Sequence, residues 1–152
     1  MQISEPVDVF VGRCMAAFNA RRPGAQVRVT AATLGPTPRL AHDLALRQAV
    51  LNLLGNAADA SSRPIDLRIG WDDDSISIEI RDHGPGLSAE VEDRIGELFF
   101  TTKALGSGNG LGLCLAQLAV MRLGGSLQLT NAEGGGALAR VLLPVVAATP
   151  PE

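Results

Sequence analysis

Three stretches of the chain space their apolar residues as amphipathic helices do. This spacing predicts helices over residues 7–20, 41–60 and 111–123. Each stretch is followed within a few residues by Pro or Gly, which end helices. A shorter helix is expected over residues 88–98, because the Ser at its first position is a favourable N-cap. Residues 99–110 are polar, rich in Gly and without periodicity, so we expect a loop there.

Five other stretches alternate apolar and polar residues, as strands with one buried face do. They cover residues 26–32, 65–71, 76–80, 126–131 and 137–143. The acidic turn Asp72-Asp73-Asp74 joins the second stretch to the third, which predicts a hairpin. Hairpins mixed with helices predict an α+β fold, a two-layer sandwich in which a mixed sheet of about five strands is covered on one face by about three helices.

Length and composition fit one domain. The chain has 152 residues, of which 46% are hydrophobic and 19% charged, so it has enough apolar material for a core and too much for a disordered chain. We expect the folded domain to span residues 1–146. A disordered tail is expected at residues 147–152, where two Pro occur.

Charge and hydropathy argue against several kinds of partner. The net charge of −3 does not favour a nucleic acid or an anionic membrane held by bulk electrostatics. No apolar run has the length of a membrane span, and the first residues lack the basic start of a signal peptide. We therefore expect a cytoplasmic domain without direct membrane contact. Cys14 and Cys114 lie far apart in apolar stretches, which indicates buried thiols rather than a disulfide or a metal centre.

The helix predicted over residues 41–60 carries a narrow polar stripe. Gln48, Asn52 and Asn56 recur every four residues, so they share one side of the helix, with Asp59 one turn further. Apolar residues flank the stripe on both sides, and buried amides need hydrogen-bond partners. The stripe has two interpretations. Its amides are tied to nearby loop backbone, or they form the polar wall of a ligand cavity, where an Asn carbonyl oxygen could bind a hard cation such as Mg²⁺.

A carboxylate ends the apolar row of Ile76, Ile78 and Ile80. Strand alternation places Asp82 on the same face, toward the core, where a carboxylate needs a donor. One interpretation is an Asp that caps its own turn. The other is a fixed acceptor at the bottom of an apolar pocket, suited to an exocyclic amine such as that of adenine. In the next segment, His83-Gly84-Pro85-Gly86, two glycines would let a ligand approach the backbone, and we expect the His ring at the edge of the pocket.

Glycines alternate from Gly106 to Gly112, directly before the last predicted helix. The backbone N–H groups of such a loop, together with the positive end of the helix dipole, form a favourable phosphate site. Flexible turns share this composition, so the loop alone is a weak signal. The sequence lacks GxxxxGK[ST], and the loop does not follow the first strand of a βαβ unit. A P-loop and the dinucleotide-binding motif are therefore excluded.

The order of these features along the chain resembles that of a known ATP-binding domain. LRQAVLNLLGNAADAS resembles the N box of sensor histidine kinases, RDHGPGL the first Gly box, ELFFTTK the F box and GSGNGLGLCLAQ the second Gly box. GGGALARVLLP at residues 134–144 is similar to the closing strand pair. The resemblance, over roughly residues 5–146, is to the catalytic domain of these kinases, in the superfamily of gyrase, Hsp90 and MutL ATPases with the Bergerat fold. NLLGNAADAS together with DHGPG is most similar to the redox-responsive RegB/PrrB type.

The resemblance implies a role for each residue of the stripe and the first Gly box. Asn56 would be the Mg²⁺ ligand, and Asn52 would support the metal and the phosphates of ATP from one turn earlier. Asp82 would accept a hydrogen bond from the adenine amine. Gly84 and Gly86 would let the base lie flat.

The resemblance also implies roles for the loop that this family uses as an ATP lid. Lys103 would reach a phosphate oxygen and complete a catalytic set with Asn52 and Asn56. The nucleotide-binding residues implied in this part of the chain are Phe99, Phe100, Thr102, Lys103, Gly106, Gly108, Gly110, Leu111 and Gly112.

Asn52 favours a kinase over a hydrolase. The ATP-hydrolysing relatives place a Glu one helical turn before the metal-binding Asn, where it polarises an attacking water. An amide cannot act as that base, so the resemblance implies that the γ-phosphate is kept for another nucleophile.

The chain offers no suitable phosphoacceptor for such a transfer. His83 lies in the first Gly box, and His42 lies at the start of a predicted helix without the Arg and Pro of a phosphoacceptor motif. The resemblance therefore implies transfer from ATP·Mg²⁺ to a histidine on a separate dimerisation and phosphoacceptor domain, a helical hairpin, and then to a response regulator. The parent protein of such a domain can be anchored in the inner membrane.

Two other functions remain open on the sequence. One is a free-standing kinase of the anti-sigma type, which phosphorylates Ser on a partner protein. The other is a degenerate module that binds nucleotide, or only a partner, without transfer.

Overall fold

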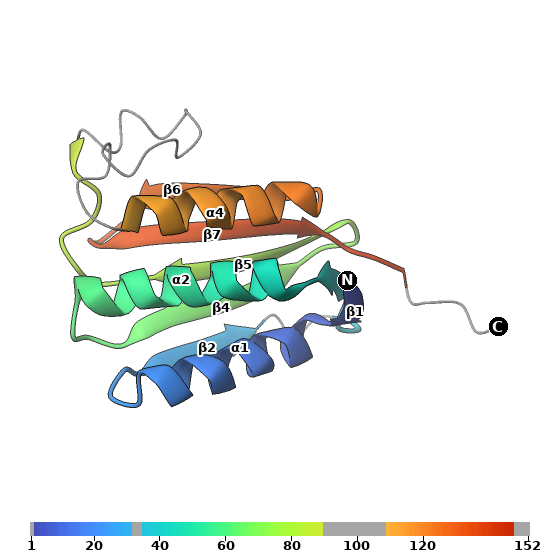
Figure 1. Ribbon diagram of the computed structural model, residues 1–152, viewed down its shortest axis with the longest axis horizontal. Helices are drawn as coiled ribbons and strands as arrows, with labels where there is room; N and C mark the ends of the chain where they lie inside the picture. The colour runs from blue at the N-terminus through green and yellow to red at the C-terminus, as the bar shows by residue number, and fades with distance from the viewer. Residues whose placement is uncertain (1, 32–34, 90–108, 148–152) are drawn as a thin grey trace.

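The computed structural model describes residues 2–31, 35–89 and 109–147. Within these residues, three helices cover one face of a five-stranded mixed sheet (Figure 1). A two-stranded sheet lies where the first two helices begin. This arrangement confirms the predicted two-layer α+β sandwich.

The helices are α1 (Val7–Arg21), α2 (Leu44–Ala60) and α4 (Asn109–Arg122). The large sheet contains, in order across it, β2 (Val27–Ala31), β4 (Ile65–Trp71), β5 (Ser75–Arg81), β7 (Ala137–Pro144) and β6 (Ser126–Asn131). The small sheet pairs β1 (Ile3–Pro6) with β3 (Arg39–His42). β2 runs parallel to β4, and the other neighbours in the large sheet are antiparallel.

The face of the large sheet under the helices is apolar. In one row across four strands, Leu67 pairs with Ile80, Ile80 with Ala139 and Ala139 with Leu129. The core-facing row predicted on β5 is confirmed, because its three Ile side chains are at most 2% exposed. Burial of such side chains stabilises the fold by about 25 cal/mol for each Å² removed from water.

α2 lies in the middle of the helical layer, beside α4 (Figure 1). Its N-terminus is capped by Asp43, whose Oδ1 accepts a hydrogen bond from the backbone N–H of Leu46 at 2.9 Å. Leu46, Val50 and Leu54 are fully buried in the core. The helix turns this apolar side to the sheet, which leaves the amide stripe on its flank.

The structure contains two strands that the sequence does not predict. β1 and β3 have four residues each, too few for alternation to distinguish a strand from a loop. The expected helix start at residue 41 is wrong, because residues 41 and 42 belong to one of these short strands, β3. Ala41 and His42 pair with β1, and the helix begins at Leu44.

The other described elements differ from prediction only at their ends. The helix expected over residues 88–98 and the loop over 99–110 fall mostly on residues 90–108, outside the described part of the chain. The expected tail lies outside it from residue 148 onward. None of the helices in the described ranges is long and apolar enough to cross a bilayer.

Candidate functional site

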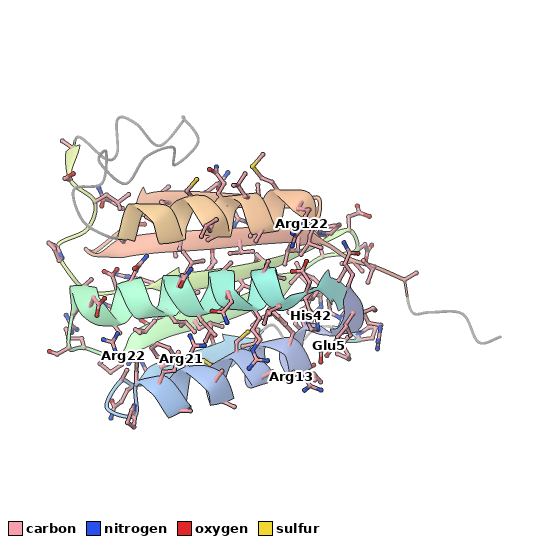
Figure 2. All side chains as sticks on the ribbon, viewed as in Figure 1. Glu5, Arg13, Arg21, Arg22, His42 and Arg122 are labelled. Atoms are coloured by element: carbon pink, nitrogen blue, oxygen red, sulfur yellow. The ribbon has the colours of Figure 1, made fainter. Side chains whose placement is uncertain are left out.

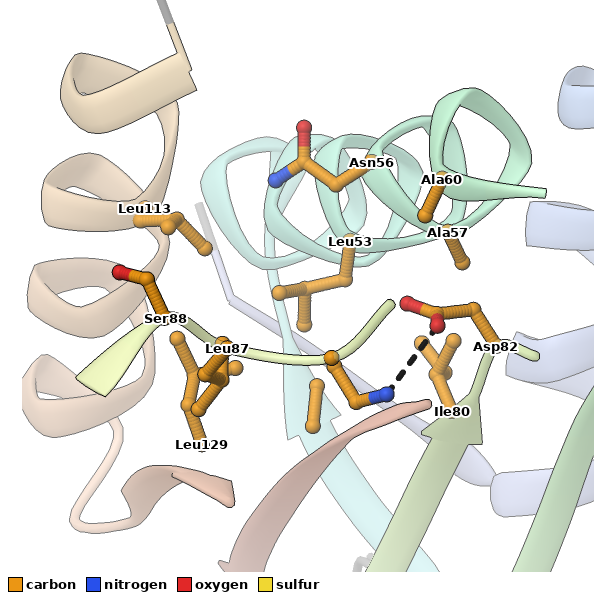
Figure 3. Close-up of a pocket in the computed structure, with 13 residues that line it drawn as sticks. Leu53, Asn56, Ala57, Ala60, Ile80, Asp82, Leu87, Ser88, Leu113 and Leu129 are labelled. Atoms are coloured by element: carbon orange, nitrogen blue, oxygen red, sulfur yellow. Dashed lines mark hydrogen bonds between the residues drawn. The ribbon is translucent and has the colours of Figure 1, made fainter. Parts of the chain in front are cut away.

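A cavity of about 300 Å³ lies between α2, α4 and the ends of β5 and β7 (Figure 3). Most of its lining is apolar, and a few polar groups face into it. The lining residues are Leu53, Asn56, Ala57, Ala60, Ile80, Asp82, Gly86, Leu87, Ser88, Leu113, Leu129, Ala137 and Ala139. Apolar walls with a few convergent polar groups are typical of a small-molecule site. The cavity brings together Asn56, Asp82 and Gly86, which the sequence places in separate motifs.

Asp82 is the buried carboxylate of this cavity, with 8% of its surface exposed. Its Oδ1 accepts hydrogen bonds from the backbone N–H of Gly84 at 2.9 Å and of Ala137 at 3.1 Å. Oδ2 makes no hydrogen bond with a described residue, and Figure 3 shows this oxygen turned toward α2. The interpretation of Asp82 as the cap of its own turn is therefore confirmed for Oδ1. The role of Oδ2 as an acceptor for a ligand stays a prediction.

The amide stripe of α2 divides between two hollows. Asn56 lines the cavity that contains Asp82. Gln48 and Asn52 line a neighbouring groove between α2 and α4. The three amides are half-buried and make no hydrogen bond within the described part of the chain, so no tie to described loop backbone accounts for them. Asp59 does not extend the stripe, because it is exposed and pairs with Arg22 at 2.9 Å.

The first Gly box packs directly against the C-terminal end of α2. A Cβ on Gly84 would lie 2.5 Å from the carbonyl oxygen of Ala60, a distance that no side chain tolerates. Gly86 has a φ of 81°, in the left-handed region that favours glycine. Both positions therefore need glycine for the path of the backbone itself.

The ring of His83 lies on the other side of the sheet from the cavity, so its expected position at the pocket edge is wrong. Adjacent residues of an extended chain point to opposite faces, so His83 points outward where Asp82 points inward. Its Nε2 lies 2.8 Å from Oδ2 of Asp66. Partial burial opposes ionisation of Asp66, but hydrogen bonds from His83 and Arg28 outweigh it and hold the pKa of this carboxyl below its ordinary value.

His42 is buried, with 7% of its surface exposed. Its Nε2 bonds to the Glu5 carboxylate, to which Nε of Arg13 also donates at 3.1 Å; Figure 2 shows the three side chains where α1 and α2 begin. A ring enclosed and bonded in this way cannot serve as a phosphoacceptor on the surface, which agrees with the expectation from sequence.

The start of β7 contributes residues to the site that the sequence reasoning missed. Gly136 has a φ of 86°, and a Cβ there would lie 2.0 Å from the carbonyl oxygen of Asp82. Ala137 lines the cavity and donates to the Asp82 carboxylate. The run of three glycines before β7 is a signal in the sequence for such a close approach, but it does not name the segment approached.

Much of the predicted lid lies outside the described residues. This applies to Phe99, Phe100, Thr102, Lys103, Gly106 and Gly108. Gly110 and Leu111 lie in the first turn of α4, where the structure describes only the backbone. Gly112 lies against α2, because a Cβ on it would be 3.6 Å from Nδ2 of Asn52. This described part of the second Gly box thus lies beside the amide stripe.

Residues 41–147 match the family model described as histidine kinase-, DNA gyrase B- and HSP90-like ATPase. The chain belongs to this ATPase family. The match covers α2, the cavity and the strands below it, so the residues that meet in the cavity are those of a family ATPase domain.

Curated relatives of this ATPase domain are sensor proteins. It is 40% identical over 116 residues to the C4-dicarboxylate transport sensor protein DctB of Pseudomonas aeruginosa, covering 70% of this chain and 19% of DctB. It is 31% identical over 134 residues to the sensor histidine kinase CpxA of Escherichia coli, covering 86% of this chain and 29% of CpxA. The chain therefore spans less than a third of the length of either relative.

Solved structures of histidine kinases share the fold of this ATPase domain. The mycobacterial sensor histidine kinase MprB superposes with a TM-score of 0.75 at 25% identity, covering 95% of this chain and 98% of the MprB chain. The ATP-binding domain of PrrB from Mycobacterium tuberculosis gives a TM-score of 0.73 at 22% identity, covering 96% and 98%. The second likeness shows the fold alone, so the finer resemblance to redox-responsive kinases stays a prediction.

Proposed function

We propose that this ATPase domain binds ATP with Mg²⁺ and is the catalytic part of a two-component sensor histidine kinase. It hands the γ-phosphate of ATP to a histidine on a separate dimerisation and phosphoacceptor hairpin domain, which passes it to a response regulator. The domain works in the cytoplasm, whether or not the parent protein is anchored in a membrane.

The observation that carries the proposal is the free oxygen of Asp82 inside an apolar cavity. A flat aromatic base is stabilised by apolar walls such as Leu53, Leu113 and Leu129, and its exocyclic amine needs one fixed acceptor. Oδ2 of Asp82 supplies that acceptor, because Oδ1 is already held by two backbone N–H groups. The residues present therefore fit an adenine base.

Asn56 faces the same cavity and is the proposed Mg²⁺ ligand. Its carbonyl oxygen is a ligand atom of the kind that Mg²⁺ prefers, and it forms no hydrogen bond with a described residue. Bound Mg²⁺ would neutralise charge on the phosphates. Asn52, beside the first turn of α4, supports the phosphate end. With an amide rather than a carboxylate at this position, the α2 side of the site offers water no general base.

The second Gly box and Lys103 are proposed to hold the phosphates. α4 begins with Asn109 and Gly110, so the positive end of its dipole faces the residues that precede it. The proposed phosphate-binding residues are Lys103, Gly106, Gly108, Gly110, Leu111 and Gly112, with Phe99, Phe100 and Thr102 forming the base of the lid.

The phosphoacceptor hairpin is proposed to dock on α4. Leu115, Leu118 and Met121 are 46–53% exposed along one side of this helix, beside the groove it forms with α2. Three large apolar side chains on the surface of one helix are suited to the apolar side of a partner helix. The groove and the cavity are both bounded by α2 and α4, so a partner bound there would lie close to the nucleotide.

Two measurements test this function. Calorimetry should detect ATP binding by the chain in Mg²⁺, with weaker binding in EDTA. γ-Labelled ATP should then label a phosphoacceptor hairpin only when this chain is added, while the chain alone stays unlabelled and hydrolyses ATP slowly. Transfer to Ser of a partner would indicate an anti-sigma-type kinase. Binding without transfer to any tested hairpin would indicate a degenerate nucleotide-binding module, and brisk hydrolysis would contradict the role given to Asn52.

A further inference from the structure

Asn131 ends β6 next to the rim of the cavity. It continues the core-facing row of Leu127 and Leu129, as Asp82 continues the Ile row of β5. Across the sheet it pairs with Ala137, the residue whose N–H donates to Asp82. Asn131 and Asp82, which follow the core-facing apolar rows of β6 and β5, are thus both neighbours of Ala137.

The side chain of Asn131 holds the first Gly box. Its Oδ1 accepts a hydrogen bond from the backbone N–H of Leu87 at 2.7 Å. A Cβ on Gly86 would lie 2.6 Å from the same oxygen, so the amide and the backbone are in close contact there. Gly86 and Leu87 line the cavity, whereas Asn131 does not. The contact with Gly86 and Leu87 is therefore a route by which Asn131 can affect a ligand in the cavity.

The segment from Gly84 to Leu87 has few other anchors. Its backbone N–H groups donate two hydrogen bonds within the described part of the chain, one to Asp82 and one to Asn131. Pro85 has no N–H to donate. Loss of the Asn131 bond would remove the hydrogen bond that fixes the N–H of Leu87 at the far end of the segment.

We propose that Asn131 is a positioning residue for the nucleotide, because its side-chain oxygen fixes Gly86 and Leu87 as the cavity wall beside the adenine base. The inference rests on the proposed function for the identity of the ligand. The hydrogen bond itself can be tested without any ligand.

Binding of ATP and of ADP in Mg²⁺ by calorimetry is the first test. Asn131→Ala should weaken both nucleotides about three- to tenfold, the usual effect of losing one such hydrogen bond. The loss should be equal for both, because the proposal places the segment beside the adenine base, which ATP and ADP share. Asn131→Asp keeps an acceptor oxygen and should bind within about twofold of the parent chain. Thr130→Ala, an exposed neighbour on the same strand, is the matched control and should also leave affinity unchanged.

Amide hydrogen exchange of the nucleotide-free chain is the second test. Exchange at the Leu87 N–H should speed up in Asn131→Ala and stay slow in Asn131→Asp, with similar melting temperatures for both variants. Unchanged Leu87 exchange in Asn131→Ala would overturn the inference. Faster exchange with unchanged nucleotide affinity would overturn it as well, while the proposed function would stand. If the parent chain binds no ATP, the proposed function fails, and this inference fails with it.

Discussion

Ala137 and Asp82 hold each other by two hydrogen bonds. The N–H of Ala137 donates to Oδ1 of Asp82 at 3.1 Å, and the N–H of Asp82 donates to the carbonyl oxygen of Ala137 at 3.0 Å. The first residue of β7 thus fixes both the backbone and the carboxylate at the end of β5. This leaves Oδ2 in one defined place, as the acceptor proposed for the base must be.

Asp82→Asn should remove most of the affinity for adenine nucleotides. In this variant the side-chain carbonyl oxygen can still accept from the N–H groups of Gly84 and Ala137. The NH₂ group then takes the place of Oδ2 and faces the adenine amine, so that two donors oppose each other. Loss of a hydrogen bond to a charged group predicts a roughly ten- to hundredfold weaker Kd for ATP by calorimetry. Asp66→Asn, which changes a carboxylate on the opposite face of the sheet, is the matched control. Equal affinity of the Asp82 variant and the parent chain would refute the role given to Asp82.

The same alternation that located Asp82 could have placed the other residues near the end of β5. Residues 76–82 alternate cleanly, so the sequence alone puts Asp82 inward, and strict use of the pattern puts His83 outward, where the structure finds it. The contact with Ala137 could not be predicted in this way. It joins residues that are 55 positions apart, and a hydrophobic pattern carries no information about which distant backbone N–H meets a carboxylate.

β1 and β3 show a second limit of prediction from sequence. A four-residue strand gains its stability from its partner, and the register that places Ile3 opposite His42 is a tertiary feature. The helix α2, in contrast, could be predicted over most of its length because seventeen residues repeat the apolar spacing several times. A long helix with regular apolar spacing can thus be predicted from its own residues, whereas a short strand that depends on its partner strand cannot.

Asp43 connects the two helices that flank the site. Its Oδ1 caps α2, and its Oδ2 accepts from Arg122 at the C-terminal end of α4. Asp43→Ala should lower the free energy of unfolding by about 1–2 kcal/mol, because it removes both interactions. Asp43→Asn can keep the cap and lose only the ion pair, so its loss should stay below about 1 kcal/mol. Urea unfolding of both variants measures the difference. Equal losses would show that the cap contributes nothing.

Cys14 should make the fold sensitive to alkali. Burial raises the pKa of its thiol from 9.0 to about 12, so the folded state favours the protonated form. This contribution is fully present below pH 9 and is lost as the pH rises toward 12. Between pH 9 and pH 11 the loss should be about 2–3 kcal/mol, from about 1.4 kcal/mol for each pH unit.

The chain has no Tyr, so few other groups titrate in this range. Urea unfolding at pH 8.5 and pH 11 measures the effect. Cys14→Ala should show a much smaller drop between the two pH values than the parent chain does. Cys114→Ala keeps the buried thiol and should retain the full drop. A Cys14→Ala variant that loses as much stability as the parent chain would show that the thiol is not the cause.

Gly84 and Gly55 should respond in opposite ways to the same substitution. A Cβ on Gly84 would lie 2.5 Å from backbone at the end of α2, so Gly84→Ala must push the first Gly box away from the helix. We expect a loss of about 1–3 kcal/mol in unfolding free energy and weaker ATP binding, because displacement of the box also moves the wall of the cavity. Gly55 lies inside α2 with nothing within 4 Å of its Cβ position. Gly55→Ala should therefore stabilise the chain by about 0.5–1 kcal/mol, since alanine favours the helix.

Urea unfolding and calorimetry on the Gly84 and Gly55 variants measure both effects. Tolerance of Gly84→Ala with unchanged ATP affinity would mean that the box does not need its close contact with α2.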